Sequence, residues 1–177
     1  MKALSAMTQG EVGAYLQSHL RRKGIDTVLS GGAAVALYPS GRYVTHDVDL
    51  VNKDQVRRAL IRSALEELGF REEGRHFHHP ETQFLVEFPP GPLSVGDQTN
   101  PLVEEIHLDT GILRVISPTD SVMDRLAWYY HSGDRQCLSQ AVLIAQQQKV
   151  DLDRVAKWSR SEGKRKEFAI FKKSLAK

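Results

Sequence analysis

The chain has 177 residues, of which 41% are hydrophobic and 26% are charged, values that are ordinary for a globular domain with a sizeable core. The formal net charge of +2 says little about partners, and the single cysteine, Cys137, excludes an internal disulfide framework and suits a reducing cytosol. The first residues lack the apolar stretch of a signal peptide, and no segment approaches the roughly 20 apolar residues that span a bilayer. We therefore expect a cytoplasmic protein without a membrane partner.

The chain opens with a helical pattern that is followed by two strand patterns. Thr8 and Glu11 form a capping box ahead of apolar residues at helical spacing, and Gly24 ends this helix. Short runs of β-branched and apolar residues follow, separated by small residues. They predict strands over 27–30 and 43–51 and, between them, a helix over 33–38.

The middle of the chain continues this alternation. Asn52 is a candidate cap for a helix that Gly69 ends. The expected buried face of this helix consists of Val56, Leu60, Ala64 and Leu68. An alternating run then predicts a strand over 83–88, and the segment 104–116 predicts a hairpin that turns at Asp109-Thr110-Gly111.

The last third of the chain has helical patterns throughout. Ser117, Pro118 and Asp120 supply an N-cap, a proline at the first helical position and a capping-box acid. Helices are expected at 118–131, 135–148, 152–161 and 164–176. Strands and helices therefore mix in the first part of the chain, and helices alone follow. We predict an α+β core over 1–116 and a C-terminal helical part over 117–177 that packs on it.

Two carboxylates lie in the second strand with one residue between them. Because side chains alternate along a strand, Asp47 and Asp49 share one face with Thr45, and their Cα atoms lie roughly 6.5–7 Å apart. Two like charges this close raise each other's pKa and cost stability unless a cation lies between them. Hard oxygen ligands at this spacing suit Mg²⁺, although a D-x-D pair by itself also marks solvated strand ends.

Glu87 is the third candidate ligand. In the strand over 83–88, Phe84, Val86 and Phe88 occupy the apolar face, and Glu87 points the other way. If this strand lies beside that of the two aspartates, three carboxylates meet on one surface. Three acids can hold two metal ions, which clamp the attacking and leaving oxygens of a phosphoryl transfer. The alternative is an ordinary outward-facing glutamate on an edge strand.

Gly31-Gly32 lies between the first strand and the helix that follows it. A glycine pair at this point lets backbone N–H groups approach an anion, and a helix N-terminus favours negative charge. The alternative is a tight turn that needs a positive φ angle. A phosphate-binding turn followed by a metal-binding pair of acids predicts a site for a nucleoside triphosphate.

The segment LSGGAAVALYPSGRYVTHDVDLV (29–51) resembles the signature of the DNA polymerase beta-like nucleotidyltransferase superfamily. In that signature, a glycine pair or Gly-Ser precedes an Asp-hydrophobic-Asp strand. The arrangement of Arg42, Thr45 and Asp47-Val48-Asp49 looks most similar to the small bacterial branch near the AbiEii-type abortive-infection toxins and related uncharacterised proteins. FLVEFPPGPLSVGD and SPTDSVMDRLAWYYHSGDRQCLSQA are similar to later segments of that branch, so the resemblance covers most of residues 25–155.

The resemblance implies a nucleotidyltransferase fold, with a mixed β-sheet flanked by helices and a C-terminal helical extension. It also implies transfer of a nucleotidyl group from an NTP to an acceptor hydroxyl with Mg²⁺ or Mn²⁺. Asp47, Asp49 and Glu87 would be the catalytic metal ligands, and Glu87 would activate the attacking hydroxyl. The nucleotide would be bound by Gly31, Gly32, Arg42, Thr45, Arg125 and Asp134. Three of these positions depart from the family pattern, which usually has Ser at Gly32, Asp at Glu87 and Lys at Arg125.

We therefore predict a Mg²⁺-dependent nucleotidyltransferase that uses an NTP and modifies a hydroxyl of an RNA, such as tRNA, or of a protein. One form of this activity is the toxin of a toxin–antitoxin pair, which would bind an antitoxin protein. The three departures leave a second function open, namely a catalytically weak or inactive protein of the same fold that binds nucleotide or a partner protein. A metal-dependent glycosyltransferase ranks last, since those folds normally need a longer chain.

Two further features have plainer explanations beside their functional ones. His76, His78 and His79 lie in a predicted hairpin turn and suggest zinc, phosphate or RNA contacts, although no further zinc ligand occurs at suitable spacing around them. The tail over 163–177 carries clustered basic residues that suit nucleic acid, whereas its phenylalanines favour a solvated helix that packs on the core.

Overall fold

The computed structural model describes residues 2–38 and 45–176, which form two compact units. The first, here called the sheet unit, falls within 1–34, 45–93 and 103–116, and the second, the helical unit, falls within 35–44, 94–102 and 117–177. Arg42 lies outside the described residues. None of the helices in the described ranges is long and apolar enough to cross a membrane. The predicted division of the chain after residue 116 stays a prediction.

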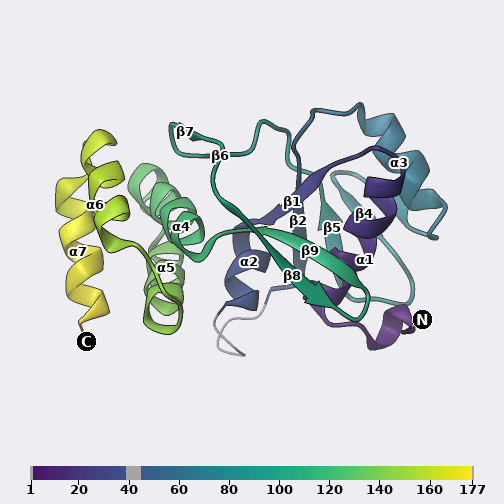
Figure 1. The fold of residues 1–177 in the computed structure, drawn as a ribbon, viewed down its shortest axis with the longest axis horizontal. Coiled ribbons are helices and arrows are strands. Elements are labelled where there is room, and N and C mark those ends of the chain that lie inside the picture. The colour runs from purple at the N-terminus through teal and green to yellow at the C-terminus, as the bar shows by residue number, and fades with distance from the viewer. Residues whose placement is uncertain (1, 39–44, 177) are drawn as a thin grey trace. The chain divides into compact units, whose positions relative to one another are not determined.

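A mixed sheet of seven strands, counted over the described residues, forms the centre of the sheet unit (Figure 1). Its strands are β1 (Thr27–Ser30), β2 (Asp47–Asn52), β3 (Arg71–Glu73), β4 (His76–His78), β5 (Leu85–Glu87), β8 (Val103–Leu108) and β9 (Gly111–Ile116). They are ordered β3-β4-β5-β2-β1-β9-β8. β2 pairs with β5 and β1 with β9 in parallel, while the other neighbouring strands are antiparallel.

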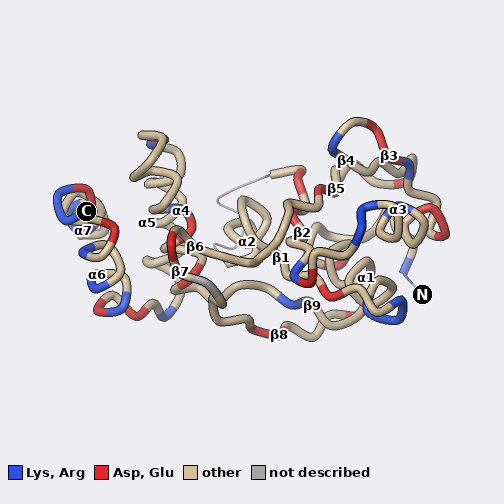
Figure 2. The backbone as a smooth tube through the Cα atoms, turned by 90° about the horizontal axis from the view of Figure 1, so that it is seen from above, with Lys and Arg blue, Asp and Glu red and all other residues tan. Residues whose placement is uncertain are grey.

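The helices α1 (Gln9–Arg22) and α3 (Arg58–Glu66) lie on the same side of this sheet (Figure 2). α1 begins at the predicted capping box, in which Thr8 Oγ1 accepts from the Glu11 backbone N–H and the Glu11 carboxylate accepts from that of Thr8. Three apolar residues of α1 are fully buried against its neighbours, namely Val12, Leu16 and Leu20. The predicted α+β class, with a mixed sheet flanked by helices, is therefore confirmed.

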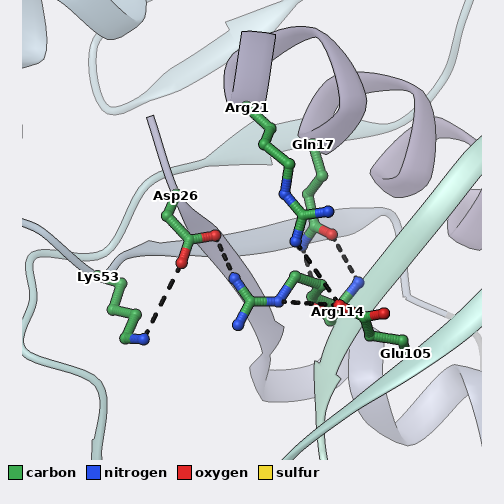
Figure 3. A network of polar contacts seen from close by, with 6 residues as sticks. All are labelled: Gln17, Arg21, Asp26, Lys53, Glu105 and Arg114. Carbon is green, nitrogen blue, oxygen red and sulfur yellow. Dashed lines mark hydrogen bonds and ion pairs between the residues drawn. The ribbon is translucent and has the colours of Figure 1, made fainter. Parts of the chain in front are cut away.

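A polar network ties α1 to the sheet (Figure 3). The Gln17 side chain behaves like a strand partner of Arg114, because its Oε1 accepts from the Arg114 backbone N–H at 2.7 Å and its Nε2 donates to the Arg114 carbonyl at 2.9 Å. The Arg114 guanidinium donates to Asp26 and lies 3.7 Å from a Glu105 oxygen. α1, the start of β1, β8 and β9 are thereby held together on this face of the sheet.

The turn after β2 differs from the prediction for Asn52. Asn52 is the last residue of β2, and its side chain donates to the Val56 carbonyl at 2.7 Å and accepts from the Val56 N–H at 3.0 Å. Asparagine competes for nearby backbone groups in this way, so the turn is extended and α3 begins at Arg58. The predicted buried face is confirmed at Ala64 and is wrong at Leu60, which is 50% exposed. The buried residues of α3 are Ile61, Ala64 and Leu65.

The other strand predictions agree with the structure to different degrees. β1 coincides with the predicted strand over 27–30, and β8 and β9 form the predicted hairpin. β2 begins at Asp47 and β5 spans three residues, so both are shorter than expected over the described residues. The β3–β4 hairpin had no strand prediction. The 3-10 helix η1 (Leu4–Ala6) precedes α1, and α2 (Gly31–Leu37) follows β1 directly.

The helical unit contains the elements of the last third of the chain. Its helices are α4 (Pro118–Ser132), α5 (Arg135–Gln147), α6 (Leu152–Ser161) and α7 (Arg165–Leu175), and its short hairpin consists of β6 (Ser94–Val95) and β7 (Gln98–Thr99). All four helices lie close to their predicted ranges. α4 begins at the predicted cap, where Ser117 Oγ accepts from the Asp120 N–H at 3.1 Å. In α7, Phe171 is fully buried, as the packing explanation of the tail requires.

Candidate active site

The strand register brings the predicted acids onto one face of the sheet. β2 and β5 are parallel neighbours, and their register pairs Asp49 with Glu87. Residues in register on adjacent strands point to the same side, so Asp47, Asp49 and Glu87 share one face. The opposite face carries Val48, Leu50 and Val86, which are fully buried. The strand of Glu87 therefore lies beside the strand of Asp47, which the expected surface of three acids requires.

Two more residues extend this line of side chains across the sheet. β1 pairs Ser30 with Asp49, and β4 pairs His76 with Glu87. A row of polar residues therefore crosses four adjacent strands, and its members are Ser30, Asp49, Glu87 and His76. Ser30 and His76 were not expected in this row, because the pairing of β4 with β5 involves a strand that the sequence pattern does not predict.

Gly31 lies directly against the Asp49 carboxylate. Its φ angle is +65°, and a Cβ atom at this position would collide with Oδ2 of Asp49. The sequence-based expectation of a Gly31-Gly32 turn ahead of a helix at 33 is corrected, since both glycines belong to α2, which starts immediately after β1. The positive φ angle was anticipated for the pair and is found at Gly31 alone of the two. Glycine is needed here for both the backbone conformation and the close approach.

Substituting Gly31 with alanine tests this close packing. We expect the strained backbone conformation to cost Gly31→Ala about 1–3 kcal/mol, and we expect the collision with the Asp49 carboxylate to add to this loss and to displace the carboxylate. Gly24→Ala is the matched control, because Gly24 has a φ angle of +74° and nothing lies within 4 Å of its would-be Cβ. Urea unfolding of both variants separates the two contributions. Equal losses of stability would show that Gly31 is not packed on Asp49.

The backbone of Asp47 is held from two sides. Gln9 Nε2 donates to the Asp47 carbonyl at 2.6 Å, and Thr45 Oγ1 accepts from the Asp47 N–H at 3.2 Å. The Thr45 hydroxyl therefore has a local role at the start of β2, beside the nucleotide-binding role that the resemblance implies. Gln9, in the first turn of α1, was not recognised from the sequence. These contacts fix where β2 presents its acids.

The carboxylate of Glu87 is turned toward β4. Its Oε2 lies 3.6 Å from Nε of Arg75 and 3.6 Å from Nε2 of His76. Over the described part of the chain, no three His, Cys, Asp or Glu side chains lie close enough together to hold a metal ion. The backbones of the three acids are thus adjacent, while the side chain of Glu87 has a cationic neighbour of its own.

The three acids nevertheless fit a divalent metal in their chemistry and placement. Carboxylate oxygens are the ligands that Mg²⁺ prefers, and Asp49 and Glu87 lie on directly paired positions of adjacent strands. The absent side chain at Gly31 leaves room for the Asp49 carboxylate next to the start of α2. Asp47, Asp49 and Glu87 are therefore the residues that would hold the ion.

Arg125 and Asp134 belong to the helical unit, and each has local partners there. The Arg125 guanidinium donates to Asp124 Oδ2 at 2.6 and 3.0 Å, and its side chain is only 11% exposed. Asp134 is the N-cap of α5 and accepts from the Gln136 N–H at 2.8 Å. This backbone N–H is the main reason that the pKa of Asp134 lies below its ordinary value. The N-cap hydrogen bond thus gives Asp134 a structural role in α5, and its predicted contact with the nucleotide stays a prediction.

Two of the three histidines in the segment 75–80 lie on a strand rather than in the turn. His76 and His78 are in β4, and His79 packs on Phe70 with ring centroids 5.0 Å apart. Among the described residues, these histidines belong to no group of three His, Cys, Asp or Glu side chains that could hold a zinc ion. Their position on the sheet makes His76 a neighbour of the acids instead.

Cys137 is buried in α5. Burial raises the pKa of its thiol to about 11. We expect iodoacetamide to modify native Cys137 at pH 7.5 roughly a hundredfold or more slowly than the unfolded chain, since only the thiolate reacts. Mass spectrometry of timed samples with and without urea checks this. Equal rates in both states would contradict the burial.

Three solved structures are similar to this fold. A nucleotidyltransferase-like antigenic protein from Paracoccidioides brasiliensis has a TM-score of 0.58 at 17% identity, with 77% of this chain and 74% of that chain covered. The solution structure of the antibiotic-resistance factor ANT(2'')-Ia has a TM-score of 0.51 at 15% identity, with 92% and 90% covered. A crystal structure of ANT(2'')-Ia with adenylyl-2''-tobramycin has a TM-score of 0.49 at 15% identity, with 90% and 94% covered.

Sequence comparisons add nothing to these likenesses. No protein-family model matches the chain, and no curated protein matches it in sequence. The structural likenesses lie below 25% identity and therefore concern the arrangement of the backbone. The branch near the AbiEii-type toxins stays a prediction. The likenesses to the solved structures show that this chain has the nucleotidyltransferase fold.

Proposed function

We propose that this protein is a Mg²⁺-dependent nucleotidyltransferase that transfers a nucleotidyl group from an NTP to a hydroxyl of an RNA or a protein. The observation that carries the proposal is the β2–β5 register, which pairs Asp49 with Glu87 on the face that Asp47 shares. The nucleotidyltransferase fold of the chain supports the same reaction class. A toxin whose partner is an antitoxin protein is the biological role that the resemblance of segment 29–51 suggests.

The residues of this chain have separate tasks in the proposed reaction. Asp47 and Asp49 would hold Mg²⁺ together with Glu87, and the ion, when bound, would offset the negative charge that builds up on the transferring phosphoryl group. Gly31 and Gly32 would lie beside the triphosphate. Glu87 would accept the proton of the acceptor hydroxyl, which is the role that the resemblance gives it.

The proposed step balances as a simple displacement. The acceptor oxygen forms a bond to the α-phosphorus of the NTP, and the bond from this phosphorus to the oxygen that bridges to the β-phosphate breaks. Pyrophosphate leaves, and the proton of the acceptor hydroxyl passes to the Glu87 carboxylate. The predicted contacts of Arg42, Thr45, Arg125 and Asp134 to the nucleotide are part of the same proposal.

A transfer assay tests the proposed activity. The protein is incubated with Mg²⁺ and each NTP labelled at the α-phosphate, in the presence of bulk tRNA or a cell extract. We expect label on a macromolecule and release of pyrophosphate, and nuclease and protease digestion then tell an RNA acceptor from a protein acceptor. Label that never leaves the nucleotide pool, with no pyrophosphate released from any NTP, would overturn the proposal.

A second function is favoured by one observation. Because Arg75 and His76 lie beside the Glu87 carboxylate, the third acid is engaged within the sheet unit itself. A catalytically weak or inactive protein that binds nucleotide or a partner protein agrees with this arrangement. Equilibrium binding of labelled NTP without transfer to any acceptor would support this function over the first.

A further inference from the structure

The side chain of Glu87 belongs to a group of three residues at the edge of the acid face. Glu87 Oε2 is 3.6 Å from both Arg75 Nε and His76 Nε2, and Arg75 Nε donates to His76 Nε2 at 3.3 Å. The β4–β5 register places His76 directly beside Glu87. Arg75 precedes β4 in the turn of the hairpin, so its guanidinium reaches over His76 to the carboxylate.

The turn that carries Arg75 is itself fixed to α3. Arg58, the first residue of α3, donates from Nη2 to the Arg75 carbonyl at 2.9 Å and from Nε to Glu72 at 2.5 Å. The Arg58 guanidinium also lies over the Phe77 ring, 5.3 Å from its centroid. The backbone of Arg75 is therefore held in place, whereas its side chain is 74% exposed. Such an arrangement lets the guanidinium leave the carboxylate without unfolding the hairpin.

Arg75 and a metal ion would compete for the Glu87 carboxylate, whose Oε2 faces the guanidinium. A carboxylate that ligates Mg²⁺ points its lone pairs at the ion, and a guanidinium uses the same lone pairs. In the structure the carboxylate of Glu87 faces Arg75 and His76, and the described residues contain no group of three ligands. A glutamate side chain has one more rotatable bond than an aspartate side chain, and with this bond the carboxylate can turn between the two partners.

We propose that Arg75 is a positioning residue that holds the Glu87 carboxylate on the β4 side and competes with the divalent metal for it. The inference rests on the proposed function, because it assumes that Glu87 is a metal ligand. The contact with Arg75 would control when Glu87 becomes a metal ligand together with Asp47 and Asp49. His76 lines the resting position of the carboxylate and accepts the hydrogen bond that orients Arg75.

Mn²⁺ affinity, measured at one pH by the loss of the free-ion electron paramagnetic resonance signal, tests the inference without any catalytic assay. We expect Arg75→Gln to tighten Mn²⁺ binding about two- to fivefold, the range that an exposed ion pair spans. Arg71→Gln is the matched control, because Arg71 is an exposed arginine on the same hairpin and its loss changes the net charge equally. It is expected to change the affinity less than Arg75→Gln does.

A double-mutant cycle shows whether the effect passes through Glu87. In a Glu87→Gln background, Arg75→Gln is expected to leave Mn²⁺ binding unchanged, since the carboxylate for which the two cations compete is gone. An equal effect of Arg71→Gln, a persistent effect in the Glu87→Gln background, or weaker binding by Arg75→Gln would each overturn the inference. If neither the wild-type protein nor Arg75→Gln binds Mn²⁺, the metal site of the proposed function fails as well, which separates the two failures.

Discussion

Asp49→Asn is expected to lower the rate of nucleotidyl transfer by about a hundred- to a thousandfold. Asp49 is paired with Glu87 across β2 and β5 and packs against Gly31, so it occupies the centre of the acid face. Asparagine keeps the shape of the side chain and removes its charge. A bound metal supplies several kcal/mol of transition-state stabilisation, which corresponds to the expected loss of rate. Initial rates of label transfer at saturating NTP measure it.

The control for this variant is Asp109→Asn. Asp109 is an exposed acid in the turn between β8 and β9, and its substitution changes the net charge by the same amount. We expect Asp109→Asn to transfer label at the wild-type rate and Asp49→Asn to keep the wild-type melting temperature within a few degrees. Similar rates for the two variants would remove Asp49 from the active site.

Asp120→Ala is expected to destabilise the helical unit by about 3–5 kcal/mol, the cost of breaking a buried ion pair. The Asp120 side chain is 0% exposed and accepts from Arg154 at 2.6 and 3.0 Å. It also accepts from Ser117 Oγ at 2.5 Å and from the Leu102 N–H at 3.1 Å. Its loss leaves a half-buried guanidinium and a backbone N–H without their acceptor. The midpoint of thermal unfolding is expected to fall by on the order of 10 °C.

Asp153→Ala provides the comparison for this stability measurement. Asp153 is an exposed acid in the first turn of α6, next to Arg154 in sequence, and its removal is expected to change stability by less than about 0.5 kcal/mol. Circular dichroism during heating and urea titration reports both variants. A loss for Asp120→Ala no greater than that for Asp153→Ala would show that the buried pair does not stabilise the unit.

Local patterns predicted the parts of the fold that depend on neighbouring residues. The capping box at Thr8, the strand β1 and the cap at Ser117 all follow from short-range hydrogen bonding and periodicity. A hairpin turn was predicted around His76, His78 and His79, but the strands β3 and β4 could not be predicted in this way. Their residues, Arg71–Glu73 and His76–His78, are mostly charged or polar and lack an apolar alternation. The sequence predicts that Asn52 caps a helix, whereas its side chain closes a turn with Val56. An asparagine side chain suits both roles, so the residue type alone does not separate them.

The candidate site was predictable up to the point where distant strands meet. Alternation along β2 predicts that Asp47 and Asp49 share a face, since this property belongs to one strand. The pairing of Asp49 with Glu87 depends on which strands are neighbours, and that choice is made by long-range packing. The orientation of the Glu87 carboxylate depends in turn on Arg75 and His76, which reach it only through the hairpin.

If Asp47, Asp49 and Glu87 form one metal–nucleotide site, Mn²⁺ bound there broadens the amide resonances around it. Backbone amide resonances of the isotope-labelled protein are recorded while Mn²⁺ is added in the presence of a non-hydrolysable NTP. We expect the resonances of Gly31, Asp49 and Glu87 to broaden first, and we expect Asp49→Asn to abolish this broadening. Unchanged intensities at these residues, with broadening confined to other acids such as Asp109, would contradict it.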